Sequence, residues 1–355
     1  MTGNNVFFLG HSTPDGFSTH LSDDINSGAF TTYILKGGPG TGKSSLMKKV
    51  AAAMSETEDP EIYYCSSDPD SLDAVVLRKS KAIIVDGTAP HVFEPKYPGV
   101  REVLIDLGGC WNIDRLKNNR ENIIDATDRN QKYHAAVKRY LKAIITLNDD
   151  IMTLGASCLN KPKLDAYCDR LCAKLFPKSK RPQAGILHRQ ISSITPKGMI
   201  THSEIFKDMT IFKIDDDYCA VSARLMSKLA ECAASSGYDV IVSENVLMPS
   251  GAYQHIVIPE LKIAFTSSNT EALQKSASAS INALRFYDRY SLKGKKKRAA
   301  FDRGMAEKLT YEAIEALKTA KDIHDELESY YIDAMNFDMV NSVTDELILR
   351  LKKSV

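Results

Sequence analysis

The sequence predicts an α/β protein in which one unit occurs twice in tandem, each copy built on a mostly parallel sheet. Apolar runs of strand length alternate with stretches of helical periodicity, which is typical of βαβ units. Short segments recur in the same order at nearly constant spacing. Each copy ends in a long proline-free stretch of helix-forming residues.

The internal repeat rests on three pairs of segments. Residues 13–20 recur at 195–202, with five of eight positions identical and a spacing of 182. Residues 46–51 match 225–230 at a spacing of 179. A third, weaker match pairs the lysine and apolar run that begin at residue 81 with those that begin at residue 262. Three collinear matches at nearly one spacing indicate a duplicated unit rather than a chance likeness between α/β segments.

The first copy alternates expected strands with an expected helix. Strands are expected at 31–35, 61–65, 82–85 and 103–105. The run 82–85 is apolar throughout, as in a strand that is buried on both faces. A helix is expected at 44–54, where Leu46, Val50 and Met54 share one helical face.

The segments after each sheet are expected to be helical. Residues 114–157 contain no proline and have apolar residues at helical spacing, so we expect a long helical hairpin, with a shorter helix at 163–176. The second copy ends in similar stretches at 300–335 and 336–352.

A Pro-rich basic linker at 176–182 separates the two copies. We therefore expect a first domain at 1–177, with its helical hairpin at 114–176. The second domain is expected at 186–355, with C-terminal helices at 300–352.

Composition excludes several classes of protein. The 355 residues include 46 Lys+Arg, 45 Asp+Glu and 43 % hydrophobic residues, which excludes a disordered chain. A net charge of +1 gives no global basic field, so nucleic acid is not an expected partner, and the basic run at 293–298 is expected to be a solvated loop before a helix. The seven cysteines lack metal-site spacing, and no apolar run approaches the ~18 residues of a membrane span. We expect a cytoplasmic protein with no membrane partner.

One segment is highly specific for a function. Residues 37–44 fit the pattern G-x-x-x-x-G-K-[ST] in full, directly after an expected strand and before an expected helix. Glycines allow backbone N–H groups to turn inward around phosphate, and the helix N-terminus adds the positive end of its dipole. We therefore expect two P-loop NTPase-like domains in tandem, each followed by its long helical hairpin. The expected nucleotide-binding residues are Gly37, Gly38, Pro39, Gly40, Thr41, Gly42, Lys43, Ser44 and Ser45.

Asp86 follows the apolar run 82–85, where a carboxylate at a strand end would hold Mg²⁺. Ser44 and Asp86 are therefore the expected metal ligands, and Lys43 would bridge the β- and γ-phosphates. An aspartate that merely ends a strand is the alternative for Asp86. ATP is the expected nucleotide, because the string N-K-P-K at 160–163 lacks the aspartate of the guanine-specific pattern N-K-x-D.

Two loops are candidates for the rest of an active site. Loop 66–73 follows the second expected strand, and its Asp68 and Asp70 would position water or a substrate hydroxyl. A helix N-terminus capped by Asp70 or Ser71 is equally compatible with this loop. The loop after Asp86 contains His91, which would contact phosphate or substrate, or lie at the surface in a turn. The catalytic candidates are Lys43, Asp86, Asp68, Asp70 and His91.

Four strings stand out together: F-F-L-G-x-S-T-P-x-G, K-G-G-P-G-T-G-K-S, C-S-S-D-P-D-S-L-D and V-D-G-T-A-P-H-x-x-E-P-K-Y-P-G. Together they resemble a group of bacterial P-loop ATP-binding proteins with two tandem repeats, described only as ATPases of unassigned role. The resemblance covers most of residues 5–110, and the remainder by the order of the repeats. It implies the P-loop fold and nucleotide binding, and it names no substrate.

The second copy departs from that family, in which both repeats normally carry a P-loop. At a spacing of 179, Asp216 and Asp217 replace the first two glycines, and Ser222 and Ala223 replace the lysine and the serine. Ser267 stands where the first copy has Asp86. Two carboxylates would repel phosphate, so we expect the second copy to bind no nucleotide.

The expected function is Mg²⁺-dependent ATP hydrolysis or phosphoryl transfer at a single site in the first copy, toward an unidentified acceptor. The alternative is a nucleotide-gated switch or scaffold with slow or no turnover. In that case the second half is a pseudo-NTPase domain that binds a protein partner.

Overall fold

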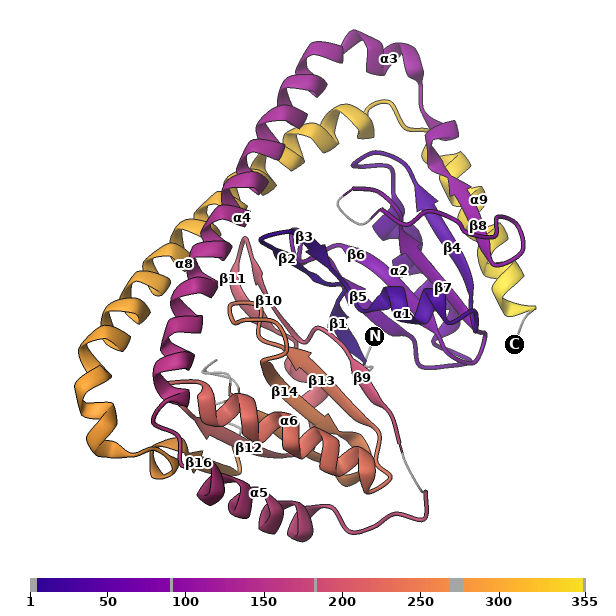
Figure 1. Cartoon of the computed structure of the whole chain (residues 1–355). Coiled ribbons are helices and arrows are strands. Elements are labelled where there is room, and N and C mark those ends of the chain that lie inside the picture. Colours follow the sequence, from indigo (N-terminus) through magenta and orange to yellow (C-terminus); the bar gives the residue numbers. More distant parts are fainter. Residues whose placement is uncertain (1–4, 90–91, 182–183, 268–272, 274–276, 354–355) are drawn as a thin grey trace. The chain divides into compact units, whose positions relative to one another are not determined.

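The computed structural model describes residues 5–89, 92–181, 184–267, 273 and 277–353. It has an α/β fold with two six-stranded mixed sheets (Figure 1). In each sheet five strands point the same way and one is antiparallel to both neighbours. The expected class, α/β with mostly parallel sheets, is therefore confirmed at this level.

The first sheet has the strand order β1-β5-β6-β7-β4-β8. Its strands are β1 (Val6–Phe8), β4 (Thr31–Lys36), β5 (Glu61–Tyr64), β6 (Leu72–Leu77), β7 (Ala82–Asp86) and β8 (Glu102–Asp106). The four expected strands are all present, whereas β1 and β6 were not expected. The alternative of a helix that begins at Asp70 or Ser71 is wrong, because every residue of β6 is buried in the sheet between β5 and β7.

The second sheet has the same strand order and the same strand directions as the first sheet. Its order, read from the matching edge, is β9-β13-β14-β15-β12-β16. Its strands are β9 (Ile186–His188), β12 (Thr210–Asp215), β13 (Val240–Glu244), β14 (Tyr253–Ile258), β15 (Ile263–Thr266) and β16 (Ala279–Asn282). Even the irregularity in the antiparallel pair recurs, at Tyr63/Tyr64 and at Ser243/Glu244. Equal order, direction and irregularity support the duplication inferred from the sequence.

The best-matched repeat segment forms a small hairpin in each copy, β2 (His11–Thr13) with β3 (Gly16–Ser18) and β10 (Ser192–Thr195) with β11 (Gly198–Thr201). The Thr13 hydroxyl donates to the Gly16 carbonyl at 3.1 Å, and the Thr195 hydroxyl donates to the Gly198 carbonyl at 2.8 Å. Both glycines have positive φ, which glycine adopts without steric cost. The shared threonine and glycine are thus explained by one turn.

The helices are α1 (Leu21–Asn26), α2 (Lys43–Met54), α3 (Ile113–Asn118), α4 (Arg120–Ala156), α5 (Lys161–Leu175), α6 (Ala220–Ser235), α8 (Arg289–Ile332) and α9 (Phe337–Lys352). The hairpin expected within 114–157 is wrong: α4 is one helix of 37 residues, because it has no proline and no glycine before Gly155 to end it. The basic run at 293–298 lies inside α8, not in a loop.

Contacts divide the chain into two compact units. Unit 1 comprises residues 1–139, 193–200 and 313–355, and unit 2 comprises residues 140–192 and 201–312. This division differs from the expected boundary near residue 180. Helix α4, which follows the first sheet, begins in unit 1 and ends in unit 2, and α5 lies in unit 2. Helix α8, which follows the second sheet, begins in unit 2 and ends in unit 1, and α9 lies in unit 1.

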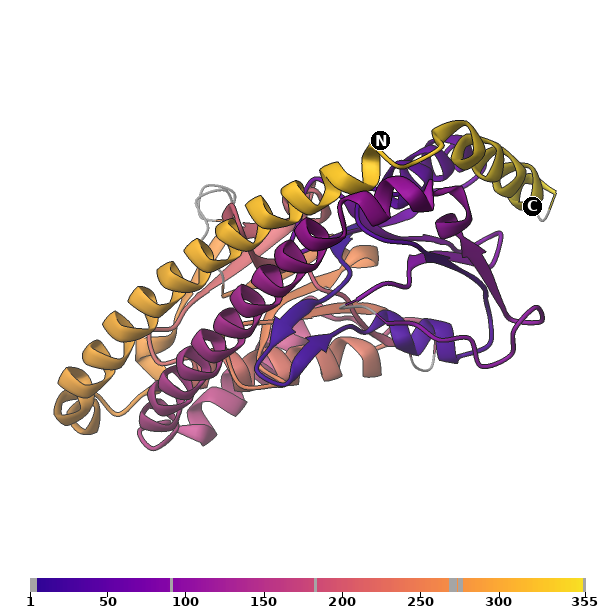
Figure 2. The ribbon, with the colours of Figure 1, turned by 90° about the horizontal axis from the view of Figure 1, so that it is seen from above.

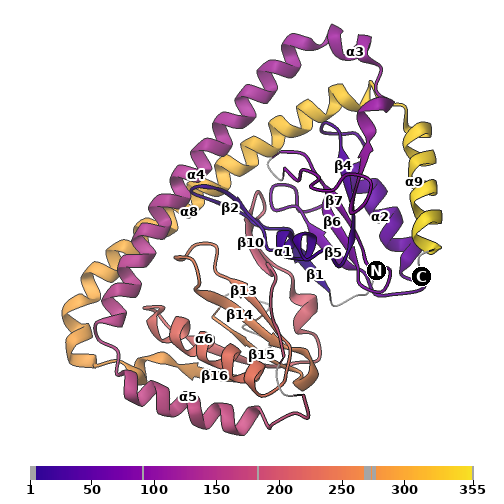
Figure 3. The ribbon, with the colours of Figure 1, turned by 45° about the vertical axis from the view of Figure 1, so that its right-hand side comes forward.

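The packing of the terminal helices explains this division (Figure 3). In unit 1, Val340, Leu347 and Leu351 of α9 are buried in the core that contains α2. In unit 2, Leu164 and Cys168 of α5 are buried in the core that contains α6. In each unit, the helix that lies on the sheet therefore packs against a helix from the other half of the sequence.

The long helices α4 and α8 run beside each other within each unit (Figure 2). In unit 1, Arg129 of α4 forms an ion pair with Glu326 of α8 at 2.9 Å. In unit 2, Asp150 of α4 pairs with Arg298 of α8 at 2.5 Å. Within the described ranges, every helix is too short or too polar to cross a lipid bilayer.

Candidate functional site

The motif 37–44 forms a loop between β4 and α2, here named the glycine loop (residues 37–42). Gly40 (φ 65°) and Gly42 (φ 88°) lie in the left-handed region, which favours glycine. Gly42 is the N-cap of α2, so the loop leads directly into the amino end of a helix with free N–H groups. This backbone path is one in which amide groups can converge on an anion.

Lys43 is the first residue of α2, and its side chain is folded back over the glycine loop. It is 8 % exposed, and its Nζ donates to the carbonyls of Gly38 at 2.7 Å and Gly37 at 3.1 Å. The same Nζ lies 3.6 Å from Oδ2 of Asp86. A buried ammonium is thus held at the loop by two neutral carbonyls and one carboxylate.

Asp86 reaches this position because β4 and β7 are adjacent parallel strands that end together, with Leu35 opposite Asp86. Its Oδ1 accepts hydrogen bonds from the backbone N–H of Thr88 at 2.8 Å and from the Thr88 hydroxyl at 2.5 Å. Burial raises the pKa of Asp86, and the neighbouring Lys43 opposes this shift. A cation at this carboxylate would relieve the cost of its burial.

Other residues of the motif fix the loop. The Thr41 hydroxyl donates to the Gly38 carbonyl at 2.9 Å, and Thr41 is fully buried. Ser44 Oγ accepts the N–H of Leu72 at 2.9 Å, which ties the start of β6 to the first turn of α2. Pro39 is half-buried in the loop, and Ser45 is exposed on α2. Of the two expected metal ligands, Ser44 follows Lys43 in the first turn of α2, and Asp86 is the last residue of β7.

The three remaining catalytic candidates, Asp68, Asp70 and His91, differ in their surroundings. Asp68 is half-buried, accepts a hydrogen bond from the Ser71 hydroxyl at 2.8 Å and lies 3.7 Å from Nζ of Lys321. Asp70 is exposed and forms an ion pair with Lys197 at 2.6 Å, and this hydrogen bond lowers its pKa. Asp70 is thus engaged at the surface, and His91 lies outside the described residues.

Lys36, which lies outside the glycine motif, holds the loop after Asp86. Its Nζ donates to the carbonyls of Gly87 at 2.9 Å and Phe93 at 3.0 Å, and to the Glu94 carboxylate at 2.8 Å. Because Lys36 is the last residue of β4, one ammonium connects the strand before the glycine loop to the loop after Asp86.

Residues from the end of α8 also contact the glycine loop. The Gly40 N–H donates to Oε1 of Glu328 at 3.2 Å, and a Cβ added at Gly38 would lie 2.8 Å from the Tyr331 ring. No local sequence pattern identifies these residues, because they follow the loop by almost 290 positions. The sequence repeat predicts a long helix after each sheet, but it does not indicate that this helix contacts the glycine loop.

The corresponding loop in unit 2 is shorter and closed. Four residues, 216–219, separate β12 from α6, against six in the glycine loop. Asp216 accepts the N–H groups of Tyr218 at 3.1 Å and Ser222 at 2.8 Å, and the hydroxyl of Tyr287 at 2.8 Å. The carboxylate of Asp216 thus occupies the amino end of α6, where an anion would otherwise bind.

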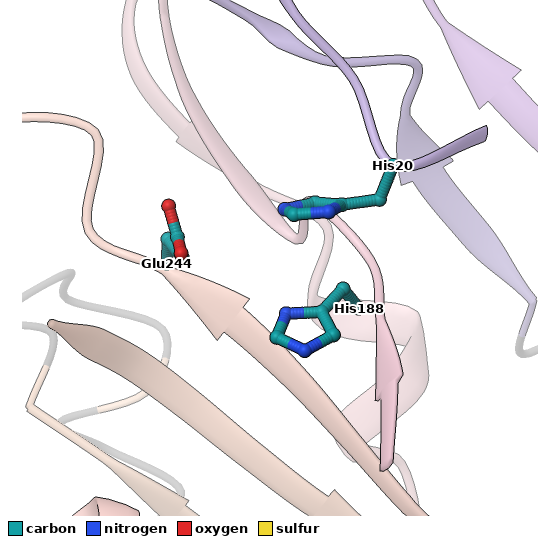
Figure 4. Close-up of side chains that lie close together, drawn as sticks. All are labelled: His20, His188 and Glu244. Atoms are coloured by element: carbon teal, nitrogen blue, oxygen red, sulfur yellow. The ribbon is translucent and has the colours of Figure 1, made fainter. Parts of the chain in front are cut away.

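Unit 2 also carries, on neighbouring strands, two side chains of types that can ligate a metal ion. Figure 4 shows His188 of β9 and Glu244 of β13, both half-buried. The third labelled side chain, His20, is part of unit 1. Two protein ligands are fewer than the three that a catalytic zinc site uses.

No family model, curated protein or solved structure matches the chain.

Proposed function

We propose that the chain is an ATP-binding P-loop NTPase with one site, formed by the glycine loop in unit 1. One observation carries the proposal: Lys43, buried at the amino end of α2, lies 3.6 Å from the carboxylate of Asp86 on the adjacent parallel strand. This is the arrangement in which a P-loop lysine and an acidic strand end act on a triphosphate. The likeness to the tandem-repeat ATP-binding family remains part of this proposal.

The residues present fit ATP and Mg²⁺. The glycines give the loop the left-handed backbone in which amide groups can converge on phosphate, and the Ser44 hydroxyl and the Asp86 carboxylate are the oxygen ligands that Mg²⁺ prefers. When bound, Mg²⁺ would neutralise phosphate charge and orient the terminal phosphate. Lys43 would then exchange its carbonyl partners for phosphate oxygens, and the half-buried Asp68 is the candidate for holding water or a hydroxyl acceptor.

We place no nucleotide in unit 2. The shorter loop 216–219 has no lysine, and Asp216 supplies a negative charge at the helix N-terminus. Ser267, which follows the end of β15, offers no carboxylate where β7 ends in Asp86. This half is proposed to be a pseudo-NTPase domain.

Thermal unfolding of the Lys43→Ala variant tests the site. With ATP·Mg²⁺ at 100 times its Kd, the wild-type protein should gain about 2.7 kcal/mol of stability. A 100-fold loss of affinity in Lys43→Ala should reduce this gain to about 0.4 kcal/mol. Lys49→Ala is the matched control, because it removes an exposed ammonium from the same helix, and it should keep the full gain. Equal stabilisation of all three proteins would contradict the assignment.

A nucleotide-gated switch is the second candidate, and the contact between Glu328 and Gly40 favours it, because a helix that touches the glycine loop can respond to nucleotide. Incubation with ATP·Mg²⁺ and a metabolite pool, followed by mass spectrometry, separates the two. A phosphorylated small molecule indicates a kinase. Turnover far below ~1 s⁻¹ that no metabolite changes indicates the switch.

A further inference from the structure

We propose that Glu328 competes with nucleotide phosphate for the N–H of Gly40, so that nucleotide binding releases the end of α8 from the glycine loop. This inference rests on the proposed function, because it concerns the same nucleotide site. It assigns to the helix that follows the second sheet a regulatory contact with the loop of the first.

Glu328 accepts a hydrogen bond from the backbone of the glycine loop. The Gly40 N–H donates to Oε1 of Glu328 at 3.2 Å. Gly40 is the fourth residue of the glycine loop and has a left-handed backbone, so its amide belongs to the group of N–H donors that a P-loop directs at phosphate. The carboxylate therefore uses one donor of the proposed phosphate site.

The surroundings of Glu328 favour the charged form of its carboxylate. Its side chain is half-buried, and His324, one helical turn earlier, lies 3.5 Å from Oε1. The hydrogen bond with His324 lowers the pKa of Glu328, and the Gly40 amide acts in the same direction. A carboxylate held in its charged form resembles a phosphate oxygen in both charge and hydrogen-bonding capacity.

The glycine loop packs closely against the end of α8. A Cβ at Gly40 would lie 2.8 Å from the backbone carbonyl of Glu328, and a Cβ at Gly38 would lie 2.8 Å from the Tyr331 ring. A Cβ at Gly42 would lie 3.3 Å from Val340 of α9. Three glycines of the loop thus face α8 and α9, so the contact is part of the packing of unit 1.

Competition follows from these contacts. One N–H cannot serve the carboxylate and a phosphate equally, and two anions at this distance repel each other. Phosphate binding therefore requires Glu328 to move away from Gly40. Because the coupling between two binding events is reciprocal, the Glu328–Gly40 contact weakens phosphate binding by the same factor by which bound phosphate weakens that contact. Removing the charge of Glu328 should then strengthen nucleotide binding, which is the opposite of what a ligand-binding residue would show.

The chain contains a natural reporter for this movement. Its only tryptophan, Trp111, packs against Tyr331 with ring centroids 5.7 Å apart, and the Asn112 N–H donates to the Ala334 carbonyl at 2.8 Å. Release of the end of α8 would change the surroundings of the Trp111 indole, so tryptophan fluorescence reports on α8 without a label.

The experiment compares the full-length wild-type protein with Glu328→Gln and Glu326→Gln. Glutamine keeps the size of the side chain and can still accept from Gly40, but it lacks the charge. Glu328→Gln should bind ATP about tenfold more tightly, which corresponds to the weaker end of charge-assisted hydrogen bonds. Its fluorescence before ATP addition should shift toward that of the ATP-saturated wild type. Glu326 lies on the same helix and faces Arg129, so Glu326→Gln should match the wild type in both measurements.

Each other result overturns the inference in a recognisable way. If ATP binds the wild type and Glu328→Gln with equal affinity, or the variant more weakly, Glu328 does not compete. If Glu328→Gln binds like the wild type and loses hydrolysis, its carboxylate acts in turnover. If neither protein binds ATP while circular dichroism shows both to be folded, the proposed function itself fails.

Discussion

Asp216→Ala should destabilise unit 2 by about 3 kcal/mol, because this carboxylate closes the amino end of α6. It accepts hydrogen bonds from the N–H groups of Tyr218 and Ser222 and from the hydroxyl of Tyr287. Loss of an acidic cap costs about 1 kcal/mol. The buried hydroxyl of Tyr287, which also accepts the N–H of Val221, would lose its acceptor at a cost of about 2 kcal/mol.

Urea unfolding followed by far-UV circular dichroism measures this effect. Asp217→Ala provides the matched control, because Asp217 is the adjacent exposed carboxylate, and its loss should change stability by less than about 0.5 kcal/mol. Asp216→Asn keeps an acceptor oxygen and should fall between the two. Calorimetry should still find one nucleotide per chain in Asp216→Ala, because the loop remains short and has no lysine. A loss below about 1 kcal/mol would refute the capping role, and a second bound nucleotide would refute the closed site.

Two further predictions concern a buried acid and a buried base. Asp86→Asn should retain part of the ATP affinity but lose Mg²⁺-dependent turnover, since the amide is a poor ligand for the metal; hydrolysis at the wild-type rate would move the metal ligand elsewhere. His255 is fully buried between Ser192 and Thr266, and burial lowers its pKa to about 3 from an ordinary value near 6.5. As the pH falls below 6.5, His255 takes up a proton in the unfolded chain but not in the folded chain, so the free energy of unfolding decreases. Between pH 7 and pH 5 this decrease amounts to about 2 kcal/mol, and His255→Gln should abolish it. Urea unfolding at the two pH values tests this, and parallel pH dependence of variant and wild type would contradict it.

Local patterns in the sequence were sufficient for the parts of the fold that depend on neighbouring residues. The strands β4, β5, β7 and β8 and the helix α2 lie where apolar periodicity predicted them. The approach of Asp86 to Lys43 also followed from local information, because parallel strands that precede and follow a crossover end at the same edge of a sheet.

The sequence was less informative where polar residues suggested two structures. Asp70 and Ser71 resemble a helix cap, yet Leu72 begins strand β6. The apolar run from Ala74 to Leu77 carries the correct signal, and burial between two strands outweighs the capping preference. The basic run in α8 likewise resembled a loop, although lysine and arginine are good helix formers.

The exchange of helices between the halves could not be predicted, because it depends on packing and not on periodicity. The sequence indicates that α9 has an apolar face, but not which core receives Val340, Leu347 and Leu351. The same limit applies to Glu328, whose role depends on the position of α8 above Gly40. Contacts between residues almost 290 positions apart leave no trace in one sequence.

This exchange gives a physical reason for a chain to keep a second copy whose loop, at residues 216–219, is shorter and has no lysine. Residues 1–177 contain the glycine loop and α2, but the helix that covers α2 is α9, from the end of the chain. Residues 186–355 contain α6, but α5 from the first half completes its core. Neither half of the sequence therefore contains the whole core of a unit. The proposed absence of nucleotide from unit 2 leaves this structural dependence intact, because the second copy supplies both the helix that covers α2 and the carboxylate that accepts from Gly40.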